Sequence, residues 1–114
     1  MSQHAALTEE RWSRFDADQQ ILMIANEMHR TSRLLADQDS EPRRRGYERI
    51  LRLTDLTIAC QRRLTFRREL LRWRDLIAVL FLADAAAPDQ HNAALRVLLR
   101  FRPVAARQIP FLLG

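Results

Sequence analysis

Apolar residues recur every three or four positions along most of this chain, with polar residues between them. This spacing places the apolar side chains on one face of an α-helix and differs from the alternation that marks a half-buried strand. Leu, Ala, Arg, Glu and Gln dominate the composition, and all five favour helices. Two glycines and four prolines leave little turn chemistry for a sheet. The pattern therefore predicts an all-α protein.

A short first helix is predicted to begin after Thr8, whose side chain suits the N-cap position. Glu9 and Glu10 follow directly, where negative charge is favoured by the helix dipole. Leu7 can pack against Trp12 as a hydrophobic staple. These features mark a helix start close to the N-terminus.

A second helix is predicted to run from Asp16 to about Asp37. Asp16 and Gln19 have the spacing of a capping box, in which each side chain binds the other residue's backbone N–H. The apolar stripe of this helix consists of Ile21, Ile24, Ala25, Met28 and Leu35, with Leu22 alongside.

Three further helices are predicted in the rest of the chain. The first runs from about Pro42 to Cys60 after Ser40, because proline is tolerated in a first turn. The next two run from about Phe66 to Asp84 and, capped by Asp89, from about Gln90 to Arg102. The inward stripe of the first of these helices is predicted to be Tyr47, Ile50, Leu51, Thr54 and Ile58. That of the second is predicted to be Leu70, Trp73, Ile77, Leu80 and Phe81, and that of the third Leu95, Leu98, Leu99 and Phe101.

Pro103 ends or kinks the last of these helices, and the apolar tail "IPFLLG" after it must dock on the rest of the protein. Four helices of roughly 12–20 residues with short links are typical of an antiparallel four-helix bundle. We therefore expect a single helical-bundle domain over residues 1–114, with a short N-terminal helix and an apolar C-terminal tail. Residues 1–7 are predicted to be a flexible tail.

Positive charge is concentrated in the middle of the chain. The net charge is +5 and all 19 cations are arginine, a bias that a GC-rich genome can also produce. Residues 1–42 carry four arginines against eight acids, whereas residues 43–74 carry eleven against three. This asymmetry indicates either complementarity between helices or a surface for an acidic partner.

Several classes of protein are excluded by the residues present. The single cysteine, Cys60, excludes an internal disulfide framework and a multi-cysteine zinc site, and fits a reducing, cytoplasmic location. The N-terminal residues lack the basic and long apolar regions of a signal peptide. No apolar run approaches the ~20 residues of a membrane span. We expect a cytoplasmic protein without membrane contact.

No enzyme chemistry is predicted from the polar residues. His4, His29 and His91 have no second histidine three or four positions away, so they do not form a metal-binding pair. No glycine-rich phosphate loop is present. We expect a protein that is not an enzyme and that binds no metal, cofactor or small-molecule substrate.

Three charged residues stand on or beside apolar stripes: Glu27, Asp55 and Arg74. Burying one such charge alone costs several kcal/mol, so pairing is favoured. The planar guanidinium of Arg74 could donate to both carboxylates. We expect an interhelical structural ion pair; the alternatives are a catalytic or ligand-binding trio, or an Asp55 exposed at the edge of its stripe.

The strongest functional indication is a basic face over the third helix, the following turn and the next helix start. Clusters of this kind bind phosphate backbones through counterion release without distinguishing sequence. A solvated face, or pairing with acids of the preceding helix, is the alternative. The predicted binding residues are Arg43, Arg44, Arg45, Arg49, Arg52, Arg62, Arg63, Arg67 and Arg68.

The order of residues resembles a family of small uncharacterised bacterial proteins. The matching parts are Trp12 with Phe15, then "QQILMIANEMHR", "YERILRLTDLTI", "RRELLRWRDLIAVLF" and "VAARQ". The most specific are "LTDLTI" and "RWRD". The resemblance implies an all-α fold and no known enzyme activity. In this resemblance, Glu27, Asp55 and Arg74 fall on positions that match the pattern of the family.

The chain departs from that family at Ala25, where the family has glycine, and at Pro103, which has no equivalent. The layout is also similar to four-helix accessory proteins of diversity-generating retroelements and of ribosomal intervening sequences. Those proteins form homo-oligomeric rings and present basic surfaces to nucleic acid and a reverse transcriptase. This similarity is one of architecture, and architecture does not fix function.

Three functional hypotheses follow. The first is a non-enzymatic, homo-oligomeric accessory protein that contacts nucleic acid, or a nucleic-acid enzyme such as a reverse transcriptase, through the Arg-rich face. The second is a protein–protein adaptor or antitoxin-like partner of an acidic protein surface. The third is an enzyme that uses Glu27, Asp55 and Arg74.

Overall fold

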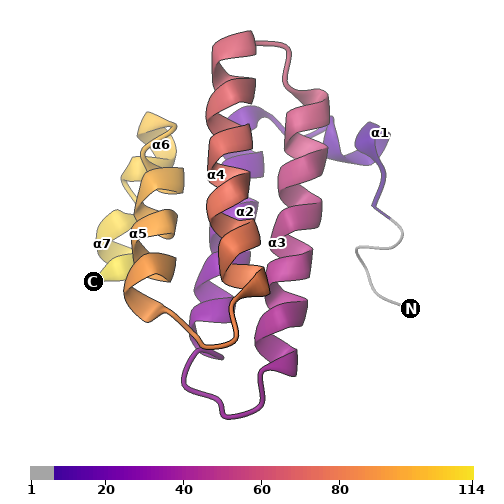
Figure 1. The fold of residues 1–114 in the computed structure, drawn as a ribbon. Coiled ribbons are helices and arrows are strands. Elements are labelled where there is room, and N and C mark those ends of the chain that lie inside the picture. Colours follow the sequence, from indigo (N-terminus) through magenta and orange to yellow (C-terminus); the bar gives the residue numbers. More distant parts are fainter. Residues whose placement is uncertain (1–6) are drawn as a thin grey trace.

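The computed structural model describes residues 7–114, and all of the secondary structure in this range is helical (Figure 1). The all-α prediction is thus confirmed. The predicted flexible tail lies, apart from Leu7, outside the described residues, as does His4. The helices are α1 (Glu9–Trp12), α2 (Ala17–Ser32), α3 (Glu41–Cys60), α4 (Leu64–Leu82), α5 (Pro88–Leu99), α6 (Pro103–Ala106) and α7 (Ile109–Leu113).

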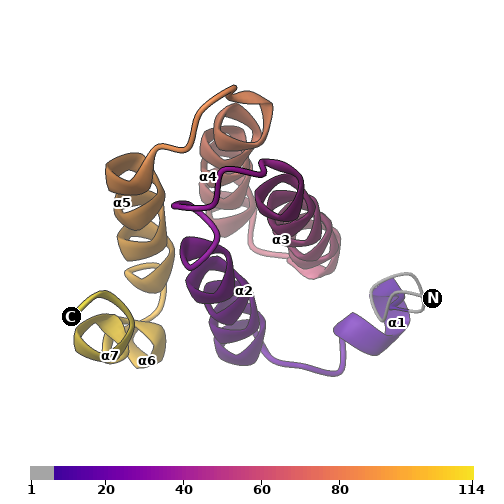
Figure 2. The same ribbon diagram turned by 90° about the horizontal axis from the view of Figure 1, so that it is seen from below.

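The four long helices, α2 to α5, surround one core. Helix α3 packs against α2 and α4, and α5 packs against the same two helices, so each long helix has two long neighbours. The view along the helices shows this arrangement (Figure 2). Helix α1 lies against α3, and α6 and α7 lie against α5. Within residues 7–114, no helix combines the length and apolarity needed to cross a bilayer.

The predicted caps of the first two helices are confirmed. The backbone N–H of Arg11 donates to the Thr8 hydroxyl oxygen, and Asp16 and Gln19 form both bonds of a capping box. Three predicted boundaries are wrong, and one of them is the end of α5, which lies at Leu99 rather than near Arg102. Helix α2 ends at Ser32 rather than near Asp37, and turns follow it. Helix α5 begins with Pro88 in its first turn, because the fixed φ of proline suits that position and makes the Asp89 cap unnecessary.

The predicted apolar stripes form the core. Most of their members are fully or nearly fully buried, while Leu35, Leu51, Phe81 and Phe101 are partly buried at its edge. Both tryptophans are buried with their polar atom satisfied. The indole N–H of Trp12 donates to the Thr57 hydroxyl at 2.9 Å, and that of Trp73 donates to the Ala94 carbonyl at 2.8 Å. These two bonds tie α1 to α3 and α4 to α5.

The predicted apolar tail is helical and docks on the rest of the protein, as expected. Pro103 opens α6, whose Ala105 is fully buried, and residues 109–113 form α7. Ile109, Leu112 and Leu113 pack against the core, whereas Phe111 is 78% exposed.

Helices α2 and α3 approach closely at Gly46. A Cβ atom at this position would lie 2.4 Å from the Thr31 hydroxyl oxygen and 2.9 Å from its methyl carbon. We expect Gly46→Ala to lower the free energy of unfolding by about 2 kcal/mol, although alanine is the better helix former, because overpacking outweighs propensity. Thr31→Ala removes both atoms, and no hydrogen-bond partner of this buried hydroxyl is present among residues 7–114.

Urea unfolding of the two single variants and the double variant tests this contact. The double variant Thr31→Ala/Gly46→Ala is expected to be more stable than Gly46→Ala alone. A Gly46→Ala protein more stable than wild type would show that the two helices can separate at no cost.

Candidate nucleic-acid interface

The first arginine of the predicted basic face is buried. Arg43 is 4% exposed, and its guanidinium donates to the carbonyls of Ala83 and Asp84, each at 3.4 Å. It therefore joins the start of α3 to the end of α4, and its assignment to a binding surface is wrong. The reason is helical spacing: Arg43 precedes Tyr47 by four residues and Ile50 by seven, so it continues their buried stripe.

Arg45, Arg49 and Arg52 share one face of α3, as their spacing predicts, but each has an acceptor within the protein. Arg45 pairs with Glu41 at 3.2 Å. Arg49 pairs with Glu27 at 3.3 Å. Arg52 donates to the carbonyl of Leu7 at 3.2 Å. Only Arg49 therefore pairs with an acid of the preceding helix, which is the alternative that the sequence left open.

Arg44 lies apart from that face, since it is one residue before Arg45 on a helix. Its Nε atom is buried, and no hydrogen-bond partner for it is present in the described part of the chain. Arg44 is partly buried as a residue. It contributes little to a continuous basic surface.

Four arginines surround the connection between α3 and α4, and we call them the α3–α4 arginine cluster: Arg62, Arg63, Arg67 and Arg68. All four are exposed. No ion pair found within residues 7–114 involves any of them. The connection spans only residues 61–63, and its backbone is held by a bond from the Arg63 N–H to the Gln61 side chain at 3.0 Å. The cluster is thus exposed, and none of its members forms an ion pair with an acid of the described residues.

The start of α4 strengthens the positive potential around this cluster. Its first turn contains no acid, and its N-cap residue, Arg63, makes no capping bond from its side chain. The N-terminus of a helix already carries about half a positive charge from the aligned peptide dipoles. Arginines at this end raise the local potential further, at some cost in helix stability. This helix start thus has arginines where acidic residues are usually favoured.

A small polar hollow of about 190 Å³ adjoins the cluster. It lies between the start of α4 and the end of α5, with Arg63, Glu69 and Arg102 among its lining residues. Phe66 and Phe101 pack edge to face in its wall, with ring centroids 5.9 Å apart. Arg102 is held by Asp18 at 2.6 Å, which fixes one side of the hollow. The hollow therefore carries both signs of charge, because Glu69 lines it and Arg102 is paired with Asp18, and the uncompensated positive charge stays at the connection and the start of α4.

Of the predicted charged trio, Asp55 and Arg74 lie together. The Arg74 guanidinium donates to both oxygens of Asp55, at 2.5 and 3.3 Å, and this bond is the largest influence raising the pKa of Arg74. The pair is not buried, because the Asp55 side chain is 47% exposed. Asp55 stands on α3 between Leu51, four residues before it, and Ile58, three residues after it, so it lies at the edge of the buried stripe that borders α4. The predicted interhelical pair of Asp55 and Arg74 is therefore confirmed, but it lies at the exposed edge of the stripe and not in the core.

Glu27 has other partners. This buried carboxylate pairs with Arg49 of α3 at 3.3 Å and with Arg30 of its own helix at 3.4 Å. The prediction that Arg74 holds both carboxylates is therefore wrong, because Glu27 lies beside α1 in a hollow lined also by Trp12 and Leu53. The charged trio does not form one site.

The two interhelical ion pairs are expected to differ in strength. Arg49→Met should lower the free energy of unfolding by about 2 kcal/mol, because Glu27 is buried and loses a charged donor. Arg74→Met should cost less than about 1 kcal/mol, because the partner is exposed. Urea unfolding of the two variants compares them directly. Equal losses would contradict this assignment of the buried pair.

A titratable site that sequence analysis missed lies in the core. His91 is fully buried; its Nε2 lies 2.9 Å from the Met28 carbonyl and its Nδ1 lies 2.8 Å from the Tyr47 hydroxyl. Because a carbonyl only accepts, Nε2 carries the proton and the Tyr47 hydroxyl donates to Nδ1. Burial lowers the pKa of His91 and raises that of Tyr47 to about 12. The signal was available, since His91 precedes Leu95 by four and Leu98 by seven residues.

The remaining polar groups show no metal arrangement. Among residues 7–114, no group of three or more His, Cys, Asp or Glu side chains is placed to hold a metal ion. Cys60 is partly buried, and burial, followed by Glu9, raises the pKa of its thiol. A thiol with a raised pKa is a weak nucleophile at neutral pH.

Comparison with protein-family models, with curated proteins and with solved structures finds no match to this chain.

Proposed function

We propose that this protein is a non-enzymatic accessory protein that binds nucleic acid, or an enzyme working on nucleic acid, through the α3–α4 arginine cluster. As part of this proposal, α2 to α5 form an antiparallel four-helix bundle, and the protein acts in the cytoplasm as a homo-oligomer. The bundle would serve as a scaffold that holds the cluster at one of its ends.

The observation that carries the proposal is the exposed cluster itself: four arginines within seven residues that form no ion pair within the described chain. Arginine donates two parallel hydrogen bonds to a phosphate and keeps its charge at any physiological pH. Each phosphate that is neutralised releases counterions, which favours binding without base contacts. The connection between α3 and α4 has only three residues, which keeps the four arginines close together along the chain.

The second candidate is an adaptor that binds an acidic protein surface through the same cluster. One observation favours it. Leu64 lies between Arg63 and Arg67 in the sequence and is 60% exposed. An exposed apolar side chain among cations is more typical of a surface that binds protein than of one that binds a phosphate backbone. Both candidates predict binding that weakens with salt, so they are separated by the ligand that binds.

Gel-shift titrations with single-stranded RNA, duplex RNA and duplex DNA at low salt test the proposal. We expect all three to shift, with little dependence on sequence, because the contacts are to the backbone. Absence of any shift at ~100 µM protein, beyond the range of ordinary non-specific affinities, would rule out nucleic acid as the ligand of the isolated protein. The adaptor hypothesis would then remain.

A further inference from the structure

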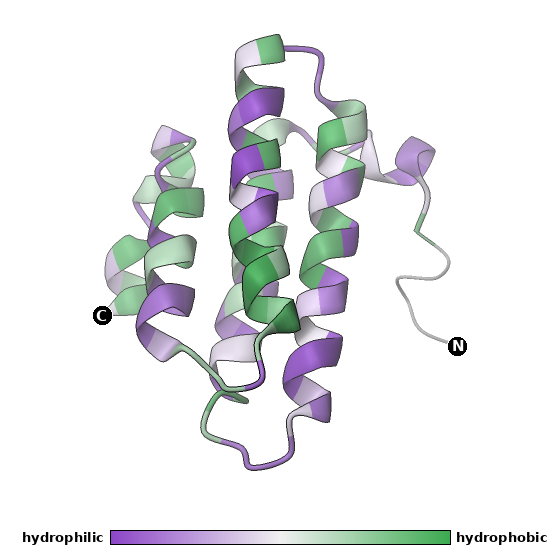
Figure 3. Ribbon diagram, viewed as in Figure 1, coloured by the Kyte–Doolittle hydropathy of each residue, from purple (hydrophilic) through white to green (hydrophobic). Residues whose placement is uncertain are grey.

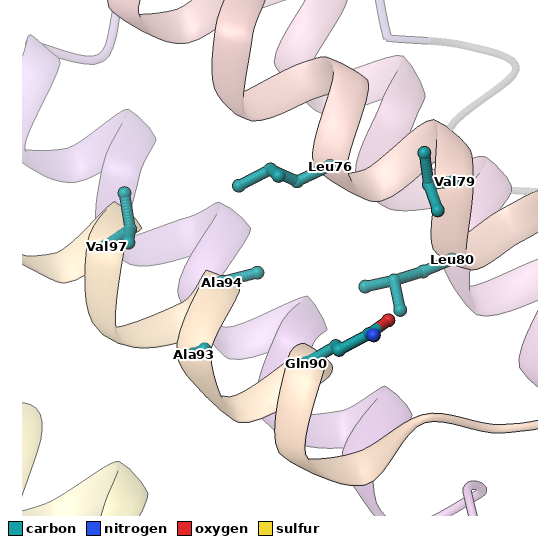
Figure 4. Close-up of a pocket in the computed structure, with 7 residues that line it drawn as sticks. All are labelled: Leu76, Val79, Leu80, Gln90, Ala93, Ala94 and Val97. Carbon is teal, nitrogen blue, oxygen red and sulfur yellow. The ribbon is translucent and has the colours of Figure 1, made fainter.

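The polar hollow beside the α3–α4 arginine cluster differs in chemistry from the rest of the surface between α4 and α5. Further along the same two helices, a hollow of about 350 Å³ is lined by apolar side chains and the amide of Gln90 (Figure 4). The C-terminal half of α4 is hydrophobic, whereas hydrophilic residues cluster toward its start (Figure 3). The polar hollow lies at this start, and its lining residues are Arg63, Thr65, Phe66, Glu69, Phe101 and Arg102.

Glu69 supplies hydrogen-bond acceptors to the polar hollow. Thr65 precedes it by four residues, so both side chains stand on one face of α4 and line the hollow together. No ion pair found within residues 7–114 involves Glu69, although arginines surround it. A carboxylate repels a phosphate, but it accepts strong hydrogen bonds from a group that carries N–H donors.

Arg102 supplies donors from the α5 side of the hollow. Its Nε donates to Asp18 at 2.6 Å, and its side chain is 31% exposed. This ion pair holds the guanidinium in place and leaves its terminal NH₂ groups to donate to a ligand. The polar hollow therefore offers an acceptor from one helix and a donor from beside the other. The edge of a nucleobase, which carries donors and acceptors side by side, matches this arrangement.

The aromatic wall of the hollow provides a surface for stacking. Phe66 is nearly buried and packs edge to face against Phe101. Phe101 is only partly buried and also lines a neighbouring hollow of about 300 Å³, so part of its ring is accessible. The polar hollow, at about 190 Å³, is smaller than the roughly 300–1,000 Å³ of pockets that enclose a drug-sized ligand. It thus suits one planar base whose sugar and phosphate stay outside.

We propose that the polar hollow binds one unpaired guanine base of a single-stranded nucleic acid whose phosphates lie on the α3–α4 arginine cluster. Guanine carries two adjacent donors, N1–H and the N2 amino group, which one carboxylate accepts together, and its O6 beside them accepts from a guanidinium. Adenine, cytosine and thymine each offer a single donor group at this edge. Glu69 and Arg102 therefore favour guanine.

The position of the hollow joins this base contact to the backbone contacts. Arg63 lines the hollow and belongs to the α3–α4 arginine cluster, so a nucleotide bound in the hollow has its phosphate beside the cluster. A base within a duplex has this edge paired and its faces stacked, so only a single strand makes the contact. The proposal rests on the proposed function and adds a preference at one position to binding that otherwise uses the backbone.

Fluorescence anisotropy of the full chain with oligo(dT) strands of about seven nucleotides tests the proposal, with the central base varied. Wild type is expected to bind the strand with a central dG about tenfold more tightly than the strand with dT alone, because hydrogen bonds to a charged group are gained. Deoxyinosine lacks only the N2 amino group of guanine, so it should lose most of this preference.

Glu69→Gln separates base recognition from electrostatics. It removes an acid from a basic surface, so it should bind the strand with dT alone at least as tightly as wild type, yet it should no longer distinguish dG from deoxyinosine. Asp75→Asn is the matched control, because Asp75 is an exposed acid of α4 outside the hollow, and it should keep the preference. Phe101→Leu should weaken binding of the dG strand about tenfold and leave duplex DNA binding unchanged.

Thermal melting of each variant confirms that it is folded. Equal affinities of wild type for the dG, deoxyinosine and dT strands, or a preference for dG that survives Glu69→Gln, would overturn the base site while the backbone interface remains. Absence of binding to every strand and to duplex DNA would instead overturn the proposed function, and this site with it. The two failures are thus distinguished by the strand with dT alone.

Discussion

Replacing Arg62, Arg63, Arg67 and Arg68 with glutamate is expected to reduce the affinity for single-stranded RNA and duplex DNA at least about 100-fold at low salt. The change removes four exposed cations and introduces four anions at the positive end of α4. Stability should be maintained or rise, because acids in a first turn complement the helix dipole. Fluorescence anisotropy gives the affinities, and thermal melting gives the stability.

The matched control has the same net charge as the cluster variant, but its four substitutions lie elsewhere on the surface. Glutamate at four other exposed arginines, Arg14, Arg33, Arg96 and Arg107, also changes the net charge by eight, from +5 to −3. This control should lose much less affinity than the cluster variant. Equal losses in the two variants would show that net charge alone governs binding and that the cluster has no special role.

The largest stability loss is expected from His91→Ala. The substitution removes a buried ring and leaves the Tyr47 hydroxyl and the Met28 carbonyl without their partner. A buried group left unsatisfied costs about 1–3 kcal/mol, so the combined loss should be about 3 kcal/mol. Tyr47→Phe, which removes only one hydroxyl, should cost about 1 kcal/mol. Urea unfolding at pH 8 measures both.

The same histidine should make stability depend on pH. Its pKa is lowered in the folded state, so the unfolded chain binds the proton more readily. Stability is then lost as the pH falls below 6.5, the ordinary value for histidine, toward the lowered folded value. Wild type should therefore lose more stability than His91→Ala between pH 7.5 and pH 5.5, a range of about two units around that value. Equal losses would show that His91 does not titrate on unfolding.

The helical elements could be predicted from the sequence because their signals are local. The capping box at Asp16 and the 3.6-residue stripes require only neighbours along the chain. The end of α2 was misjudged because Leu35 continues its stripe after the helix has stopped at Ser32. Periodicity tells which side chains face inward but cannot tell whether the backbone between them is a helix or a turn.

The candidate site was predicted only in part, because arginine partners come from other helices. Arg43 and Arg49 stand in the same arginine-rich segment as the exposed residues, yet one reaches the end of α4 and the other reaches Glu27. Sequence spacing places a residue on a face of its own helix, but it cannot tell which helix lies against that face. Arg62, Arg63, Arg67 and Arg68 were easier to place, since a three-residue connection leaves them little to pack against.

The salt dependence of duplex DNA binding tests the central claim most directly. If each arginine of the α3–α4 arginine cluster neutralises one phosphate, the slope of log affinity against log salt should be between about −3 and −4 per copy for wild type. The cluster variant, where binding remains measurable, should have a slope near zero, while the matched control keeps the wild-type slope. A wild-type slope near zero, or the same steep slope in the cluster variant, would contradict a nucleic-acid interface at this end of the molecule.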